Sequence, residues 1–246
     1  MQNIIAIVWD FDKTLVDGYM QDPIFRECGV DASAFWKEVN ALPQKYKEEG
    51  VKINPDTIYL NQFIKYVRNG IFKGLNNAKL RGYGAEQKFY PGIPEIFKIT
   101  KELLGDDSIC KEYNIRVEHY IVSTGFAEVI KGTSIMQYVE YIWGCELIEH
   151  KYEDGEKEIA EIGYTIDNTT KTRALFEINK GIIKAFKQVE KLRQDGRIDM
   201  FAEADYSKDT TAYMWICNKI SEFAERIKET EKNKRSVENS TPKHLV

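Results

Sequence analysis

Residues 4–14 read IIAIVWDFDKT, an apolar run that passes directly into two aspartates, Asp10 and Asp12. The run 4–9 is rich in β-branched residues, which is typical of a central strand buried on both faces of a parallel sheet. Residues two apart in an extended chain or loop can point to the same side, so the two carboxylates are expected to meet at the end of this strand.

Such a pair of carboxylates repels unless a cation lies between them or one of them holds a proton. Either arrangement suits catalysis, because the unprotonated carboxylate can act as a nucleophile and the protonated one as an acid. The ordinary structural alternative is an acidic turn in which Asp10 caps the loop and Asp12 is solvated. The choice between these two interpretations depends on the residues found elsewhere in the sequence.

The remaining sequence is a long helical stretch followed by alternating strands and helices. Residues 17–90 carry the helix-start signals Asp22-Pro23 and Asn54-Pro55 and no strand pattern. The elements predicted after them are a helix at 91–104, strands at 117–123 and 138–148, a hairpin turn at 153–156, helices at 169–178 and 181–193, a strand at 199–204 and a last helix from Asp209. This order predicts an α/β fold with a doubly wound parallel sheet, whose ligands lie at the carboxyl ends of the strands.

The predicted domain organisation follows from this pattern. Residues 1–16 and 91–228 form the α/β core, and residues 17–90, called the helical insertion below, form an all-helical cap after the first strand. Residues 229–246 are polar and charged and are predicted to form a disordered tail.

The composition makes several kinds of partner and location unfavourable. The net charge of −4 does not favour nucleic acid or anionic lipid as a partner. No apolar stretch approaches the roughly 20 residues of a transmembrane helix, and the N-terminus lacks the pattern of a signal peptide. The four cysteines lie far apart without metal-binding spacing, so they are expected to be reduced thiols in a soluble, cytoplasmic protein.

The strand predicted at 117–123 ends in Ser123, Thr124 and Gly125. A hydroxyl followed by a small residue at a strand-to-helix turn offers an O–H and backbone N–H groups to a phosphate oxygen. The alternative is an ordinary helix cap by Ser123 or Thr124.

The strand predicted near residue 200 is followed by further carboxylates, Asp205 and Asp209. Asp205 can complete an oxygen ligand set for Mg²⁺, although a turn residue and a helix cap are the alternatives for this pair. Lys180 opens the preceding predicted helix, where a cation can offset clustered negative charge. A solvated surface group is the alternative for any single lysine.

Together, these pieces resemble the haloacid dehalogenase (HAD) superfamily of Mg²⁺-dependent phosphohydrolases, over residues 4 to about 220. The DxDxT motif matches Asp10, Asp12 and Thr14, the second motif Ser123, the lysine motif Lys180 with Lys171 as a rival, and the last acidic motif Asp205 and Asp209. The sequence IVSTGF is similar to the phosphoserine phosphatase-like branch. The helical insertion resembles this superfamily's C1 cap.

This resemblance implies specific roles for the matched residues. Asp10 is the nucleophile that forms an aspartyl-phosphate, and Asp12 is the general acid and base. The resemblance further implies that Mg²⁺ is held by Asp10, Asp12, Asp205 and Asp209, and that the phosphoryl group is bound by Ser123, Thr124, Gly125 and Lys180.

The function implied is hydrolysis of a small phosphorylated metabolite. Alternatives within the same resemblance are a phosphotransferase or mutase, and a degenerate protein that binds a phosphorylated ligand without turnover. The last alternative arises because Ala204 and Tyr206 replace both glycines of the fourth motif. Substrate specificity is expected to reside in the helical insertion. The sequence around Tyr19-Met20 lacks the acid expected for reading phosphoserine.

Overall fold

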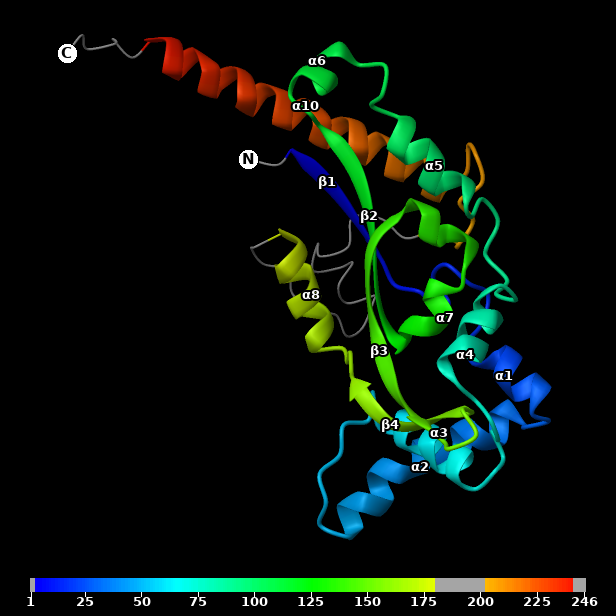
Figure 1. The fold of residues 1–246 in the computed structure, drawn as a ribbon. Helices are drawn as coiled ribbons and strands as arrows, with labels where there is room; N and C mark the ends of the chain where they lie inside the picture. Colours follow the sequence, from blue (N-terminus) through cyan, green and yellow to red (C-terminus); the bar gives the residue numbers. More distant parts are fainter. Residues whose placement is uncertain (1–2, 180–201, 241–246) are drawn as a thin grey trace.

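The sheet has four strands in the order β1-β2-β3-β4 in a computed structural model that describes residues 3–179 and 202–240. The strands are β1 (Ile4–Trp9), β2 (Arg116–Phe126), β3 (Val139–Lys151) and β4 (Lys157–Tyr164) (Figure 1). The first three are parallel, and β4 pairs antiparallel with β3 through the predicted hairpin turn. The predicted α/β class with a mainly parallel sheet is confirmed.

Helices cover both sides of this sheet. In Figure 1, α8 (Thr170–Asn179) lies on one side, and α5 (Glu95–Glu102) and α7 (Ala127–Lys131) lie on the other. In residues 3–179 and 202–240 the core also contains α6 (Ser108–Glu112), the short 3-10 helix η1 (Ser134–Tyr138) and the long α10 (Thr211–Ser240).

The helical insertion contains four helices and no strand in its fully described residues. These are α1 (Asp22–Glu27), α2 (Ala32–Glu48), α3 (Ile58–Arg68) and α4 (Asn77–Gly84). Asp31 begins α2, since its carboxylate accepts the N–H groups of Ser33 (2.8 Å) and Ala34 (3.2 Å). The helices share an aromatic core in which Phe25, Phe35, Phe63 and Phe72 are buried.

The two chain segments that join the insertion to the core run side by side. Val16 bridges to Phe89, the Asp17 N–H donates to the Lys88 carbonyl (2.9 Å), and the Tyr90 N–H donates to the Leu15 carbonyl (2.9 Å). This paired neck coincides with the predicted boundaries, although the division into domains itself stays a prediction.

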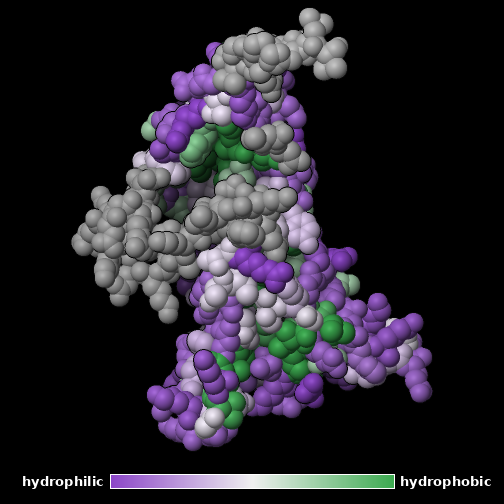
Figure 2. Space-filling view, turned by 90° about the vertical axis from the view of Figure 1, so that its left-hand side faces the viewer, coloured by the Kyte–Doolittle hydropathy of each residue, from purple (hydrophilic) through white to green (hydrophobic). Residues whose placement is uncertain are grey.

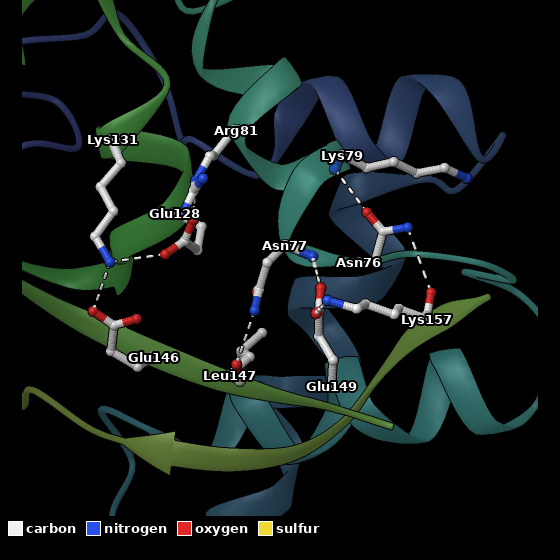
Figure 3. A network of polar contacts seen from close by, with 10 residues as sticks. All are labelled: Asn76, Asn77, Lys79, Arg81, Glu128, Lys131, Glu146, Leu147, Glu149 and Lys157. Carbon is white, nitrogen blue, oxygen red and sulfur yellow. Dashed lines mark hydrogen bonds and ion pairs between the residues drawn. The ribbon is translucent and has the colours of Figure 1, made fainter. Parts of the chain in front are cut away.

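A polar network fastens α4 to the core (Figure 3). Glu128 of α7 pairs with Arg81 of α4 and with Lys131 (2.7 Å), and Lys131 also reaches Glu146 of β3 (3.0 Å). At the other end of α4, the Asn77 backbone N–H donates to Glu149 (2.7 Å), and the Asn77 side-chain amide donates to the Leu147 carbonyl (3.1 Å). Both ends of α4 are therefore held by charged or polar groups of the core.

Two expectations about the core are modified, and others lie outside the described residues. In the described part, β1 stands at the end of the strand order rather than at its centre, because only β2 pairs with it. Residues 202–204 are irregular, so the described part of the strand predicted at 199–204 is not a strand. Residues 199–201 and the helix predicted at 181–193 lie outside the described residues.

The prediction of a disordered tail is wrong for residues 229–240, which continue α10. Good helix formers and local ion pairs such as Lys234–Glu231 (2.6 Å) support the helix. A contact with the core adds to this, because Arg235 pairs with Glu112 and its guanidinium lies 4.5 Å from the centre of the Tyr113 ring. The prediction of disorder rested on the polar composition of residues 229–246, which does not reveal these partners.

One face of the molecule is mainly polar in its described residues. Figure 2 shows a mostly hydrophilic face that is interrupted by smaller hydrophobic areas. None of the helices in the described ranges combines the length and apolar character needed to cross a membrane.

A buried histidine fixes the end of β1. Trp9 donates its indole N–H to His119 Nδ1 (3.0 Å), and His119 Nε2 lies 2.9 Å from the Thr100 hydroxyl. Because Nδ1 accepts a hydrogen bond, the neutral tautomer carries its proton on Nε2. Burial, aided by Lys101, lowers the pKa of His119 from 6.5 to about 4.

This pKa predicts a loss of stability in mild acid. Because the folded pKa lies below the unfolded one, the unfolded state takes up the proton first, and stability falls as pH drops from 6.5 towards 4. His119 alone should cost about 2 kcal/mol between pH 6.5 and pH 5. The raised pKa of Asp12 makes its own contribution to stability grow as pH falls, which opposes the effect of His119. The test therefore compares the pH dependence of the free energy of unfolding between two proteins. Urea unfolding of wild type and His119→Gln should show the acid-dependent loss attributable to His119 only in the wild type. Equal pH slopes would contradict it.

Candidate active site

The carboxyl ends of β1 and β2 bring the two predicted catalytic segments together. Trp9 pairs with Ile121 in the parallel register, so Asp10 and Asp12 follow β1 at the same edge where Ser123 lies on β2. The strand β2 continues through Phe126, and residues 123–126 are called the β2 end below. The predicted meeting of the first two motifs at one edge of the sheet is therefore observed in the register.

The two aspartates have different surroundings. Asp10 has 44% of its side chain exposed, whereas Asp12 is partly buried and its Oδ1 accepts the backbone N–H of Met20 (2.8 Å). Burial, together with the neighbouring charge of Asp10, raises the pKa of Asp12 from 3.8 to about 7, against the effect of the Met20 hydrogen bond. One carboxylate is thus accessible for attack, and the other is suited to carry a proton near neutral pH.

A lysine pairs with the exposed aspartate, and it is Lys171. Its Nζ lies 2.7 Å from Asp10 Oδ1. Lys180, the lysine that the motif spacing favoured, lies outside the described residues. Among the described residues, the lysine paired with Asp10 is thus Lys171, the rival of Lys180 in the sequence analysis.

The position of Lys171 follows from a helix start. The Asp167 carboxylate accepts the N–H groups of Thr169 (2.9 Å) and Thr170 (2.6 Å), so α8 begins just before Lys171. The helical insertion supports this turn, because Asn54 donates its side-chain amide to Asp167 (2.7 Å). The capping pattern Asp167-Asn168-Thr169-Thr170 is a sequence signal that could have placed this helix start, and the sequence analysis did not use it.

The β2 end forms a hydrogen bond within itself and two more to Met20 and Tyr59, which the sequence analysis did not assign to the site. Gly125 donates its N–H to Ser123 Oγ (3.0 Å), and Phe126 donates its N–H to Met20 Sδ (2.9 Å). The Tyr59 hydroxyl donates to the Thr124 carbonyl (2.7 Å). Ser123 is buried, and its hydroxyl hydrogen remains available to an oxygen acceptor while its oxygen accepts from Gly125.

The loop 205–210 is built around Tyr206. The Tyr206 ring lies edge-on to Trp9, with ring centres 5.6 Å apart, and its hydroxyl donates to the Thr14 carbonyl (3.2 Å). Its backbone passes so close to Gly92 that a Cβ there would lie 2.0 Å from the Tyr206 carbonyl carbon. The replacement of a motif glycine by Tyr206 is thus accommodated by a glycine on the neighbouring segment and by a side chain packed on β1.

The four predicted metal ligands do not form one cluster. Within residues 3–179 and 202–240, no group of three or more His, Cys, Asp or Glu side chains is placed to hold a metal ion. Asp205 instead accepts the Ser207 N–H (2.9 Å), and Asp209 adopts a positive φ of 68° in the same loop. The donor types nevertheless fit Mg²⁺, which is commonly bound through one or two carboxylates and several waters.

Comparison with solved structures finds proteins that this chain resembles at low identity. A HAD family hydrolase from Salmonella enterica serovar Typhi is 18% identical, with a TM-score of 0.47 over 73% of this chain and 52% of that one. Phosphoserine phosphatase in its apo form is 19% identical, with a TM-score of 0.42 over 73% of this chain and 71% of that one. A phosphoserine phosphohydrolase-like protein from Francisella tularensis is 18% identical, with a TM-score of 0.41 over 85% and 90% of the two chains.

Comparison of sequences gives a nearer relative. No family model matches the chain. A protein of Borreliella burgdorferi, described as an uncharacterized protein, is 33% identical over 284 aligned positions, which cover 89% of this chain and 97% of the relative. The chain therefore belongs to the same protein family as this Borreliella burgdorferi protein.

Proposed function

We propose that the chain is a HAD-type phosphatase that hydrolyses a small phosphorylated metabolite through an aspartyl-phosphate intermediate. The observation that carries the proposal is the unequal aspartate pair at the end of β1. Asp10 is exposed and paired with Lys171 (2.7 Å), while Asp12 is partly buried and held by the Met20 amide (2.8 Å). This arrangement supplies a nucleophile, a separate proton carrier and a cation in one place.

Each residue has a defined task in the two steps. Asp10 Oδ2, the oxygen not paired with Lys171, attacks phosphorus, and the bond to the leaving oxygen breaks as Asp12 transfers its proton to that oxygen. Asp12 then accepts a proton from water, whose oxygen attacks phosphorus and releases phosphate and the Asp10 carboxylate. Ser123 donates its hydroxyl hydrogen to a phosphoryl oxygen, and Lys171 offsets the negative charge that accumulates.

Mg²⁺ belongs to this proposal as the cofactor. Asp10, the backbone carbonyl of Asp12 and the Asp205 carboxylate are the oxygen donors that would hold it. When bound, the ion neutralises charge on the phosphoryl oxygens. Lys171 and the Ser123 hydroxyl contribute to the same end from the chain itself.

Metal removal is the direct test of the activity. Enzyme treated with EDTA should release phosphate from p-nitrophenyl phosphate and from a panel of metabolite esters only at the background rate, and excess Mg²⁺ should restore release. With an added alcohol as competing acceptor, free phosphate should remain the main product. Absence of Mg²⁺-dependent release across the panel would sink the proposal, and transfer mainly to the alcohol would replace hydrolysis by phosphotransfer.

A further inference from the structure

Met20 is the residue through which the helical insertion touches both catalytic segments. It lies just before α1 and is completely buried. Its backbone N–H donates to Asp12 Oδ1 (2.8 Å), and its sulfur accepts the Phe126 N–H (2.9 Å). The Gln87 side chain, from the returning segment of the insertion, donates to the Met20 carbonyl (3.2 Å). Asp12 and Gln87 therefore hold the backbone of Met20 from two sides, and Phe126 contacts its sulfur.

The first contact holds the Asp12 carboxyl group in one orientation. Oδ1 accepts the Met20 N–H and is occupied as a hydrogen-bond acceptor. Oδ2 faces Gly125, where a Cβ would lie 3.3 Å from it. The second carboxyl oxygen is thus directed towards the β2 end.

The second contact fixes the β2 end against the same carboxyl group. The thioether lies over Gly125 so closely that a Cβ there would be 2.2 Å from Met20 Cε and 2.4 Å from Sδ. The sulfur also satisfies a buried backbone donor, the Phe126 N–H, which would otherwise be costly to leave unpaired. Phe126 N–H is consequently committed to the protein, and substrate oxygens must be bound by other donors.

We propose that Met20 is a positioning residue that sets the distance between the Asp12 carboxyl group and the β2 end. The proposal rests on the proposed function, since Asp12 and Ser123 act on the phosphoryl group only there. Its structural part, the packing of Met20 on Gly125, holds independently of any activity. Met20 acts through these neighbours and does not touch the reacting atoms.

The experiment is a double-mutant cycle with Met20→Ala and Gly125→Ala, and Met214→Leu on the exposed face of α10 as the methionine control. Gly125→Ala forces the thioether away, so kcat should fall about a hundredfold while KM changes less than about threefold, and Tm should fall by about 5 °C. Met20→Ala makes room for the new methyl group. The double variant should therefore recover at least about tenfold in kcat over Gly125→Ala.

Met20→Leu separates the sulfur contact from the packing. Leucine fills a similar volume but leaves the Phe126 N–H unpaired, so kcat should fall about tenfold while Tm changes by only a few degrees. Wild-type kcat in Met20→Leu together with no recovery in the double variant would overturn the inference. If wild type itself releases no phosphate, the proposed function and the catalytic part of this inference fail together. The Tm values of the wild type, the two single variants and the double variant would still show whether Met20 and Gly125 are in contact.

Discussion

Replacing Asp10 with asparagine is expected to reduce phosphate release at least about a thousandfold, the largest loss of any single substitution in this chain. The amide has nearly the shape of the carboxylate but lacks its nucleophilic charge, so the aspartyl-phosphate cannot form. The ion pair with Lys171 (2.7 Å) is lost as well. The measurement is kcat with the best ester of the panel, together with mass spectrometry of acid-quenched protein, which should detect an added phosphoryl group only in the wild type.

Asp106→Asn is the matched control for this substitution. Asp106 lies in the loop before α6, which leads into the start of β2 and so to the opposite end of that strand from Ser123. It also changes one aspartate into asparagine and should leave kcat within about twofold of wild type. Substantial turnover by Asp10→Asn, in protein that melts like the wild type, would remove Asp10 as the nucleophile.

The second large effect is expected at Lys171 rather than at Lys180. Lys171→Met keeps much of the side-chain length but removes the cation beside Asp10, so kcat/KM should fall about a hundredfold. Lys180→Met removes the same charge nine positions later and should change kcat/KM by less than about threefold. The two variants are identical in chemistry, so steady-state kinetics on the pair assigns the catalytic lysine. A reversed ranking would return the role to the lysine favoured by motif spacing.

Local patterns predicted the parts of this structure that local chemistry determines. The apolar run 4–9 predicted β1, and the parallel register that pairs Trp9 with Ile121 explains why the aspartates and Ser123 share an edge. The helical character of residues 17–90 was also readable, because Pro, Gly and the spacing of apolar residues act within a few positions.

The contacts that complete the site are not local. Met20 reaches Phe126 across 106 positions, and Tyr59 reaches Thr124 across 65, and neither contact leaves a pattern in the sequence around it. Motif spacing, which counts residues along the chain, ranked Lys171 second to Lys180. The position of Lys171 beside Asp10 depends on the start of α8 at the Asp167 cap. The end of α10 was misjudged for the same reason, since Arg235 finds Glu112 far along the chain.

The fastening of α4 bears on how this protein can be recombined with its relatives. An inserted segment is usually exchanged by cutting where the chain leaves and re-enters the core, which here suggests the paired neck at Val16 and Phe89. Such a cut would remove Arg81 together with the insertion. Glu128, whose side chain is only 7% exposed, would then keep Lys131 but lose its ion pair with Arg81. A chimera should therefore keep α4 of this protein and place its second junction in the turn before Asn76. The foreign helices then join the chain there, and Glu128 keeps its ion pair with Arg81.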